Sequence, residues 1–303
     1  MILVTGAGGF IGQSVVERLL AKGYQLRLLA RGRERSEEAF PKAEIAKGDV
    51  LNPESLEKAA MGVEKIIHLA GLTSYSDRDK ERLYNINVKG TEALLKACKN
   101  AERIIFASSV AVYGETGKDE KADENYRQRP DSFYGATKQM AERLVLESGL
   151  DSVALRMAPV YGPGSRSWKK ILRFMEMGFP IPKTGSFTHI VHVTDAAKAF
   201  EIALEKGKGV YNIADKKPIP FADLAAELAR LLGKRPVLLP DNLMKILAYS
   251  AGMGTLFRIW TMNRHYDISK AGRELGYSPK AELQKEIRRV IRWYKSGMHR
   301  AEG

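Results

Sequence analysis

The first twelve residues, MILVTGAGGFIG, constrain the fold of this chain more than any other stretch. An apolar run, Ile2 to Val4, leads directly into the evenly spaced glycines Gly6, Gly9 and Gly12, and an amphipathic helical pattern follows. Strand, glycine turn and helix together are the sequence form of a dinucleotide-binding βα unit. Glycine permits positive φ and a close approach of backbone N–H groups to a pyrophosphate, and a helix N-terminus attracts the same anion.

Apolar strands alternate with amphipathic helices through the first half of the chain. Strands are predicted at 25–30, 44–47, 65–70, 103–107 and 153–157, and helices at 53–60, 79–99 and 132–147. This alternation favours an α/β fold, namely a doubly wound Rossmann-type parallel sheet covered by helices on both faces.

The pattern changes after Pro159, where prolines and glycines cluster around a helix predicted at 167–177. Further strands are predicted at 188–193 and 209–213, and further helices at 195–204, 221–232, 242–253, 267–275 and 281–294. We therefore expect two domains. Residues 1–159 and 188–214 would form the dinucleotide-binding domain, and residues 160–187 and 215–303 a smaller, helix-rich substrate lobe.

Composition limits the protein classes that remain. The chain has 303 residues, of which 44% are hydrophobic and 28% charged, as in soluble globular proteins. Its single cysteine, Cys98, excludes an internal disulfide and fits a reducing compartment. No signal peptide or membrane-spanning run is visible, so we expect a cytoplasmic location. The net charge is +13, but the basic residues are dispersed, so nucleic-acid binding is not expected.

Tyr134 and Lys138, in the stretch YGATK, are the most informative polar pair. Residues four apart share one face of a helix, where a lysine would lower the pKa of a phenol. Such a tyrosine can exchange a proton with a substrate oxygen while a hydride moves. Ser109 ends the strand before this helix, at the sheet edge where ligands bind, and can hydrogen-bond the reacting oxygen.

The chain resembles the extended short-chain dehydrogenase/reductases, also called the NAD-dependent epimerase/dehydratase family. Eight motifs carry the resemblance in order along the chain: TGAGGFIG (5–12), GDV (48–50), HLAG (68–71), NVKGT (87–91), SSVAVYG (108–114), YGATK (134–138), LRMAPVYGPG (155–164) and HVTDAA (192–197).

The resemblance implies Ser109, Tyr134 and Lys138 as the catalytic residues, with Lys138 also holding the nicotinamide ribose. The implied cofactor-binding residues are Gly6, Gly9, Phe10, Ile11, Gly12, Arg31, Asp49, Val50, Leu69, Ala70, Gly71, Asn87, Tyr134 and Lys138. His68 and His192 are expected to be structural, and no metal site is predicted. A homodimer through helices 79–99 and 132–147 is the family expectation.

The choice between NADP and NAD is made after the second strand, in LLARGRER. An acidic residue there would bond the ribose 2′-hydroxyl, whereas arginine suits a 2′-phosphate. Arg31, Arg33 and Arg35 occupy this stretch, with no carboxylate before Glu34. NADP is therefore favoured, with NAD as the alternative.

Two classes of substrate remain open, nucleotide sugars and moderately apolar small molecules. Nucleotide-sugar enzymes of the family usually carry an arginine where this chain has Thr188, and an asparagine where it has 157–159. Arg166, Lys169, Lys170 and Arg173 are candidate replacements for the missing arginine. The last third instead resembles the 3β-hydroxysteroid dehydrogenase and dihydroflavonol-reductase branch, in DISKAGRELGYSP (267–279).

Before that ending, residues 241–260 form an apolar helical stretch. It fits a hydrophobic substrate, a dimer face, a helix resting on a membrane, or packing on its own small domain. We predict an NAD(P)-dependent oxidoreductase acting on a small, moderately apolar alcohol or ketone. A nucleotide-sugar 4-epimerase or dehydratase with tightly bound NAD is the alternative.

Overall fold

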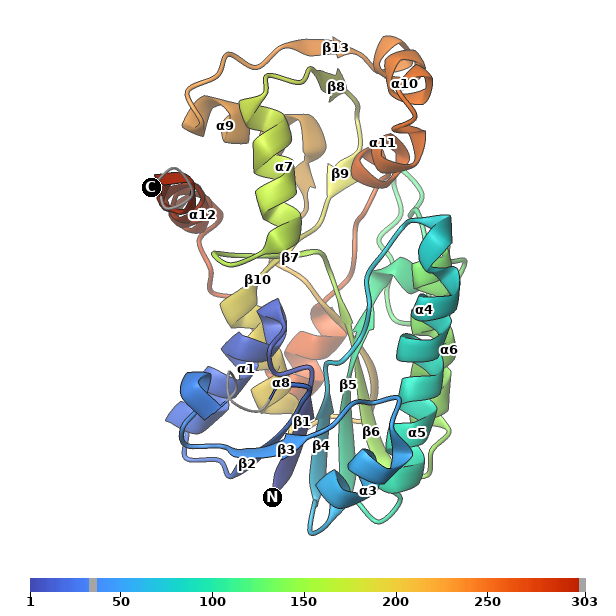
Figure 1. Ribbon diagram of the computed structural model, residues 1–303. Helices are drawn as coiled ribbons and strands as arrows, with labels where there is room; N and C mark the ends of the chain where they lie inside the picture. The colour runs from blue at the N-terminus through green and yellow to red at the C-terminus, as the bar shows by residue number, and fades with distance from the viewer. Residues whose placement is uncertain (33–36, 300–303) are drawn as a thin grey trace.

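The computed structural model describes residues 1–32 and 37–299, and within them seven parallel strands form one sheet (Figure 1). In spatial order the strands are β11 (Gly209–Ile213), β6 (Asp151–Met157), β5 (Arg103–Ser109), β4 (Lys65–His68), β1 (Ile2–Thr5), β2 (Leu26–Ala30) and β3 (Glu44–Lys47). The predicted doubly wound Rossmann-type fold is confirmed. The strand order reverses between β1 and β4, which is where ligands bind in such sheets.

Helices cover both faces of this sheet (Figure 1). One face carries α1 (Phe10–Ala21) and α8 (Val193–Ala203), and the other carries α3 (Pro53–Ala60), α5 (Gly90–Ala97) and α6 (Phe133–Leu146). Successive residues of a strand point to opposite faces, so Ile2 and Val4 join the core under α1, while Leu3 joins the core under α5.

The single helix predicted at 79–99 is interrupted. A 3₁₀ turn, η1 (Asp77–Asp79), leads into α4 (Lys80–Tyr84), and a π-helical turn, η2 (Asn85–Lys89), joins α4 to α5. Such π-turns are rare inside helices and frequently lie at functional sites. Here the π-turn contains Asn87, one of the expected cofactor residues.

A second core belongs to the C-terminal lobe. Helices α7 (Arg166–Glu176), α9 (Phe221–Leu231) and α12 (Leu283–His299) enclose it, with buried side chains such as Trp168, Leu228 and Val290. Beyond them, β8 (Ile181–Lys183) pairs with β13 (Leu238–Pro240). Helices α10 (Asp241–Ser250) and α11 (Gly254–Thr261) complete this end of the molecule (Figure 1).

The prediction of a single strand at 188–193 is wrong. The segment instead forms two short strands, β9 (Phe187–Thr188) and β10 (Val191–His192), and α8 begins at Val193. β9 pairs with β12 (Ile219–Pro220), whereas β10 pairs with β7 (Val160–Tyr161). The sequence does not reveal this change of partner, because residues 188–193 are all buried in both short strands and the link between them.

The chain returns to the sheet after α11. Tyr266, Leu275 and Tyr277 pack into the core under α1, and a π-turn, η4 (Ala271–Leu275), forms the end of the helix predicted at 267–275. The division into residues 1–159 with 188–214 and 160–187 with 215–303 stays a prediction. In the described ranges, no helix is long and apolar enough to cross a membrane.

Candidate active site

The glycine turn after β1 has room for glycine alone at two positions. Gly6 has φ +73°, and a Cβ there would lie 2.6 Å from the backbone N of Ala70. A Cβ on Gly12 would lie 2.1 Å from the carbonyl O of Gly6. Any larger residue would push the start of α1 away from the ends of β1 and β4.

The N-terminus of α1 faces the resulting cradle. Gly9 caps the helix without a side chain, so the first-turn N–H groups keep their capacity to bind an anion. Phe10 and Ile11 begin the helix, and the Phe10 ring lies against the backbone of Gly162. The cradle therefore fits the pyrophosphate of a dinucleotide cofactor.

The other wall of the cradle follows β4. The N–H of Leu69 donates to the carbonyl of Thr5 at 3.1 Å, and the N–H of Ala70 donates to the Thr5 hydroxyl at 3.2 Å. A Cβ on Gly71 would lie 3.3 Å from Asn87 Oδ1 and 3.9 Å from Lys138 Nζ. The structure thus brings Gly71, which follows β4, beside Asn87 and Lys138.

The residues expected at the adenosine end also meet. Arg31 Nε lies 3.9 Å from Asp49 Oδ2, and both side chains are exposed. Asp49 accepts a hydrogen bond from the N–H of Leu51 at 2.9 Å, while Val50 is buried against Gly90. Arg33 and Arg35 lie outside the described residues.

Tyr134 stands in the first turn of α6, which Ser132 caps by accepting from the N–H of Gly135 at 3.1 Å. Burial raises the pKa of Tyr134, and hydrogen bonds with the side chains of Ser109 and Thr73 lower it. The lowering contributions therefore come from two hydroxyls rather than from Lys138, which differs from the expectation. Ser109 also accepts from the N–H of Ala111 at 3.2 Å, so it closes β5 as well.

Lys138 lies one turn after Tyr134 and is buried, with 6% of its surface exposed. Its Nζ is 4.1 Å from the centre of the Phe106 ring. Burial lowers the pKa of Lys138 to about 7, and the carboxylate of Glu142 opposes that shift. At neutral pH this amine is therefore able to exchange a proton or donate hydrogen bonds.

Asn87 links the segment after β4 to the helix that carries Tyr134. Its Oδ1 accepts from the N–H of Leu72 at 2.7 Å, and its Nδ2 donates to the Leu72 carbonyl and to Thr137 Oγ1, each at 3.0 Å. The Thr137 hydroxyl donates in turn to the carbonyl of Tyr134 at 2.8 Å. Asn87 is 2% exposed, so these bonds are shielded from water.

A buried ionic network, which the sequence did not reveal, links α6 to the neighbouring strand β6. Glu142 and Arg156 are each 2% exposed, and their Oε1 and Nη2 atoms are 2.5 Å apart. Glu142 also accepts from Ser108 at 2.5 Å, and Arg156 donates to the Tyr113 hydroxyl at 2.7 Å. Tyr134, Lys138 and Glu142 are spaced by four residues, and this stripe was the available signal for Glu142.

The histidines of the motifs have structural surroundings. His68 is fully buried between the hydroxyls of Thr5, at 2.6 Å, and Thr91, at 2.9 Å, and burial lowers its pKa to about 3. His192 caps α8, with Nδ1 2.8 Å from the Thr194 hydroxyl. In the described part of the chain, no group of three or more His, Cys, Asp or Glu side chains is placed to hold a metal ion.

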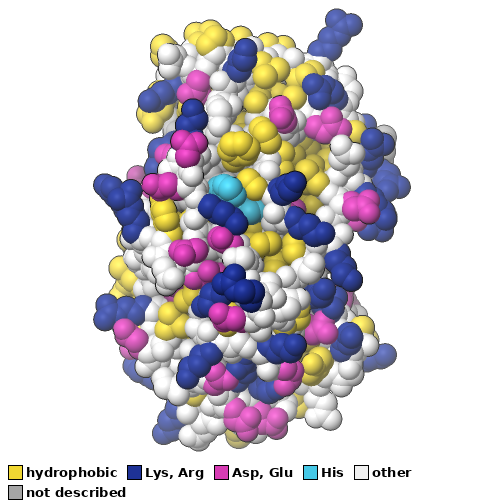
Figure 2. Space-filling view, turned by 180° about the vertical axis from the view of Figure 1, so that it is seen from behind, with side chains coloured by type: hydrophobic (Ala, Val, Ile, Leu, Met, Phe, Trp, Pro, Cys, Tyr) yellow, Lys and Arg dark blue, Asp and Glu magenta, His cyan; other side chains and the backbone are white. Residues whose placement is uncertain are grey.

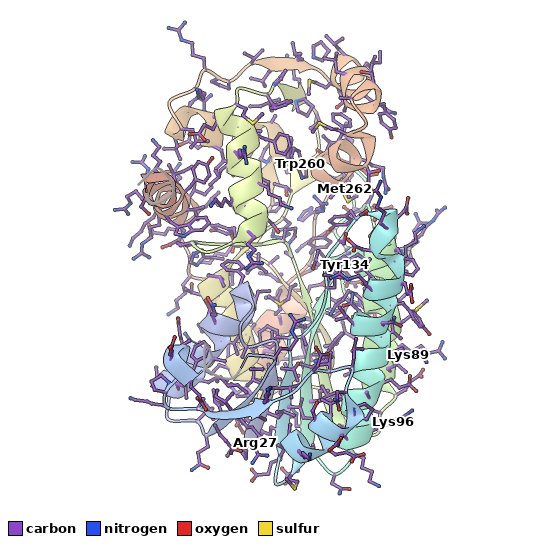
Figure 3. All side chains as sticks on the ribbon, viewed as in Figure 1. Arg27, Lys89, Lys96, Tyr134, Trp260 and Met262 are labelled. Carbon is purple, nitrogen blue, oxygen red and sulfur yellow. The ribbon has the colours of Figure 1, made fainter. Side chains whose placement is uncertain are left out.

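The C-terminal lobe reaches down to the candidate site. Arg258 of α11 donates to the Asp131 carboxylate at 3.2 Å and to its carbonyl at 2.9 Å, directly before the cap of α6. The Tyr75 ring lies 6.0 Å from the Tyr134 ring, edge to face. Tyr134 lies at the lobe-facing end of α6, below Met262 and Trp260 of the lobe (Figure 3).

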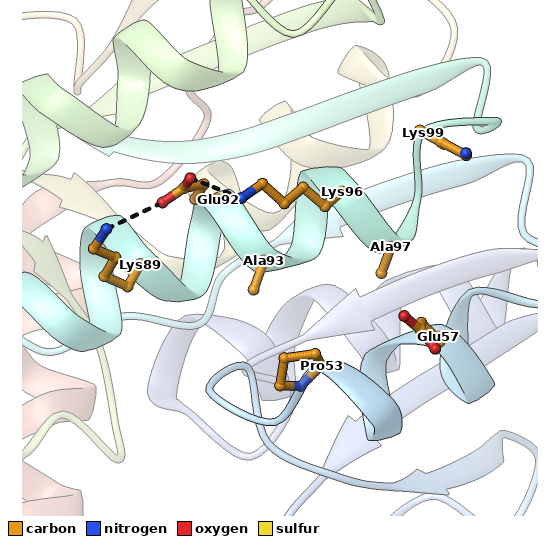
Figure 4. Close-up of a pocket in the computed structure, with 8 residues that line it drawn as sticks. All are labelled: Pro53, Glu57, Lys89, Glu92, Ala93, Lys96, Ala97 and Lys99. Atoms are coloured by element: carbon orange, nitrogen blue, oxygen red, sulfur yellow. Dashed lines mark hydrogen bonds and ion pairs between the residues drawn. The ribbon is translucent and has the colours of Figure 1, made fainter.

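A separate hollow of about 640 Å³ lies between α3 and α5. Its charged lining includes Glu92, whose carboxylate is already paired with Lys89 at 3.5 Å and Lys96 at 2.9 Å (Figure 4). None of its lining residues belongs to the candidate active site, and it resembles a solvated groove. The strand order reverses elsewhere, between β1 and β4, where Gly71 approaches Asn87 and Lys138 one helical turn from Tyr134.

Comparison with known proteins agrees with this geometry. Residues 2–214 match the model of the NAD dependent epimerase/dehydratase family. The chain is 29% identical to a putative dihydroflavonol 4-reductase of Synechocystis, over 97% of this chain and 94% of the relative. It is 26% identical to a 2-alkyl-3-oxoalkanoate reductase of Shewanella oneidensis, over 95% and 84%. A solved UDP-glucose 4-epimerase of Thermotoga maritima superposes with a TM-score of 0.81 at 26% identity, covering 98% of this chain and 99% of that one.

Proposed function

Because this chain belongs to the NAD-dependent epimerase/dehydratase family of extended short-chain dehydrogenases/reductases, we propose that it interconverts a secondary alcohol and a ketone on a small, moderately apolar molecule. One observation carries the proposal. The side chains of Ser109 and Thr73 lie close enough to the Tyr134 hydroxyl to lower its pKa, and the buried amine of Lys138 is one helical turn away. This arrangement supports a role for Tyr134 as proton donor and for Ser109 as a second hydroxyl acting on one substrate oxygen.

In the direction of reduction, Tyr134 gives its phenolic proton to the carbonyl oxygen of the substrate. The Ser109 hydroxyl hydrogen-bonds the same oxygen and fixes its position, while Lys138 stabilises the phenolate that forms. A nicotinamide cofactor supplies the hydride when bound. Asn87 acts as a positioning residue, because it holds both the backbone of Leu72 and, through Thr137, the carbonyl of Tyr134.

We propose NADP(H) as the preferred cofactor, because an exposed guanidinium, that of Arg31, ends the second strand. Asp49 lies 3.9 Å from Arg31, and both residues follow strands at the edge where the adenosine is expected to bind. With a 2′-phosphate bound, the guanidinium would exchange this exposed contact for a charge-assisted hydrogen bond.

An aromatic neighbour of Tyr134 supports a moderately apolar substrate. The Tyr75 ring lies 6.0 Å from the Tyr134 ring, and in the lobe above, the Trp260 ring packs edge to face on Phe174 at 5.4 Å. Thr188 is buried in a short strand, at the position where nucleotide-sugar enzymes of the family usually carry an arginine. The four cations of α7 named above as candidate replacements for that arginine are exposed, on the side opposite the buried Trp168 and Leu172.

A nucleotide-sugar 4-epimerase remains the second candidate, because the Thermotoga maritima epimerase shares the fold over nearly the whole chain. The two functions differ in the fate of the cofactor. A reductase oxidises NADPH and releases NADP⁺ after each turnover. An epimerase returns the hydride to its substrate, retains its cofactor, and gives no net change in nicotinamide absorbance.

We also propose that the protein forms a homodimer through α4, α5 and α6. Tyr84 on α4 is 37% exposed and Met140 on α6 is 45% exposed, so apolar side chains project from these helices. Sedimentation of the wild-type protein beside a Met140→Glu variant tests this contact. A dimer that the variant weakens is expected, and a monomeric wild-type protein would contradict it.

The functional test compares two substrate panels on the same purified protein. One panel contains aromatic and aliphatic ketones with NADPH or NADH, followed by loss of nicotinamide absorbance. The other contains UDP-glucose and UDP-glucuronic acid, followed by separation of the epimers. Steady NADPH oxidation with a ketone supports the proposal, whereas epimerisation without net oxidation would replace it with the second candidate.

A further inference from the structure

Helix α10 leaves most of its own surface exposed to solvent. None of its ten residues, all of them described, is buried. Leu243, Ile246 and Leu247 are 44%, 66% and 45% exposed, and their spacing places them on one outward face. The opposite face, with Met244 and Ala248, is half-buried against the lobe. The apolar stretch around α10 therefore does not serve mainly to pack its own domain.

The outward face of α10 continues onto its neighbours. α10 contacts β8 and β13, and Val237 and Leu238 on or beside β13 are 52% and 43% exposed. We call the set Val237, Leu238, Leu243, Ile246, Leu247 and Tyr249 the distal apolar surface. It lies at the end of the lobe farthest from the N-terminus (Figure 1), where hydrophobic side chains also gather in the view from behind (Figure 2).

Exposed cations accompany this surface. The sequence of segments 177–183 and 233–250 contains four cations, Lys183, Lys234, Arg235 and Lys245, against a single acid, Asp241. All four cations are exposed. Over the rest of the face in view, Figure 2 shows acidic and basic side chains interspersed. An apolar surface bordered by cations is complementary to a boundary that is hydrophobic in its interior and negatively charged at its surface.

We propose that the distal apolar surface docks the protein on an anionic lipid bilayer, with α10 lying in the plane of the headgroups. Leu243, Ile246 and Leu247 would enter the acyl boundary. Lys245 and Arg235 would extend their charged ends toward lipid phosphates. The cofactor-binding domain, at the opposite end of the molecule, would face the aqueous phase (Figure 1).

The positive charge around the distal apolar surface favours an anionic bilayer over a second copy of this chain as its occupant. A two-fold contact sets the same patch against itself, so each cation would face the cations of its partner. Only Asp241 would offset them, and it is half-buried. Anionic headgroups supply the missing negative charge. This inference rests on the surface alone and does not depend on the substrate proposed above.

Vesicle co-sedimentation of the full-length protein tests the inference. The probes are vesicles of pure phosphatidylcholine and vesicles in which part of it is replaced by phosphatidylglycerol. Ile246→Glu is compared with Met61→Glu, because both side chains are 66% exposed and Met61 follows α3 in the cofactor-binding domain. We expect Ile246→Glu to weaken binding to anionic vesicles by more than about tenfold. Met61→Glu should bind like wild type.

The charge contribution has its own variants. Lys245→Gln should weaken binding to anionic vesicles by about fivefold, and Lys245→Arg should restore it. Thermal unfolding and cofactor titration check that each variant is folded. Equal wild-type binding to neutral and anionic vesicles, or no binding to either, would overturn the proposal. A wild-type oligomer that dissociates in Ile246→Glu without any vesicle binding would assign the surface to self-association instead.

Discussion

Asn87 and Thr137 are joined by a 3.0 Å hydrogen bond between the side chains of the π-turn η2 and helix α6. The bond couples the wall of the cofactor cradle to the backbone of Tyr134, because Thr137 donates to the Tyr134 carbonyl. Two elements that carry different parts of the candidate site are thereby held in one geometry. Asn87 is the central residue of the π-turn Asn85–Lys89 and is buried there.

Replacing Asn87 with alanine should destabilise the protein and weaken cofactor binding. The substitution leaves the half-buried Leu72 amide and carbonyl, and the buried Thr137 hydroxyl, without this partner, which costs about 1–3 kcal/mol of unfolding free energy. Urea unfolding measures that loss, and titration with NADPH measures affinity. Asn100→Ala, at an exposed asparagine, is the control. An Asn87→Ala protein with unchanged stability would contradict the role of these bonds.

Tyr134→Phe should lower turnover by about 10²–10⁴-fold, because it removes the proposed proton donor and keeps the ring. Cofactor affinity should change little, since the phenol contributes through its contact with the substrate oxygen. Turnover on the best ketone and a cofactor titration separate the two effects. Tyr84→Phe, on the surface of α4, should behave like wild type. Full activity in Tyr134→Phe would refute the assignment of the proton donor.

The sequence predicted the sheet because its signals are local. The apolar run at Ile2–Val4 and the glycines after it specify a strand and a turn without reference to the rest of the chain. The π-turn at Asn85–Lys89 was not predictable, because the helical spacing of apolar residues runs through it without a break. Thr73 was missed for a different reason. It lies in a polar loop, and only the fold brings its hydroxyl to Tyr134.

Lys138 should make stability depend on pH. Its pKa is about 7 in the folded protein and 10.5 in an unfolded chain, so the unfolded state binds more protons between these values. The free energy of unfolding contributed by this group therefore rises with pH across that window. Lys138→Met should remove the rise, as measured by urea unfolding at several pH values. The exposed Lys99→Met variant should keep it, and parallel pH profiles for Lys138→Met and wild type would contradict the prediction.

Arg31→Ala should raise the Kd for NADPH by about tenfold or more and leave the Kd for NADH nearly unchanged. Loss of one hydrogen bond to a charged phosphate accounts for that size. Isothermal titration with both cofactors provides the measurement. Lys22→Ala removes a cation at the far end of α1 and controls for overall charge. Equal weakening for both cofactors would mean that Arg31 does not read the 2′-phosphate.

Removing one member of the Arg156–Glu142 pair should lower the free energy of unfolding strongly, whereas replacing both members with apolar residues should lower it less than the sum of the single changes. Arg156→Met leaves the Glu142 carboxylate buried without its cation, which costs about 3–5 kcal/mol. The double variant Arg156→Met with Glu142→Leu removes both charges, so it should lose less than the sum of the two single losses. Urea unfolding of all four proteins completes the cycle. Lys58→Met, which breaks an exposed pair with Glu54, should lose far less than Arg156→Met. If the losses of Arg156→Met and Glu142→Leu simply add, the two side chains do not act as one buried unit beneath Lys138.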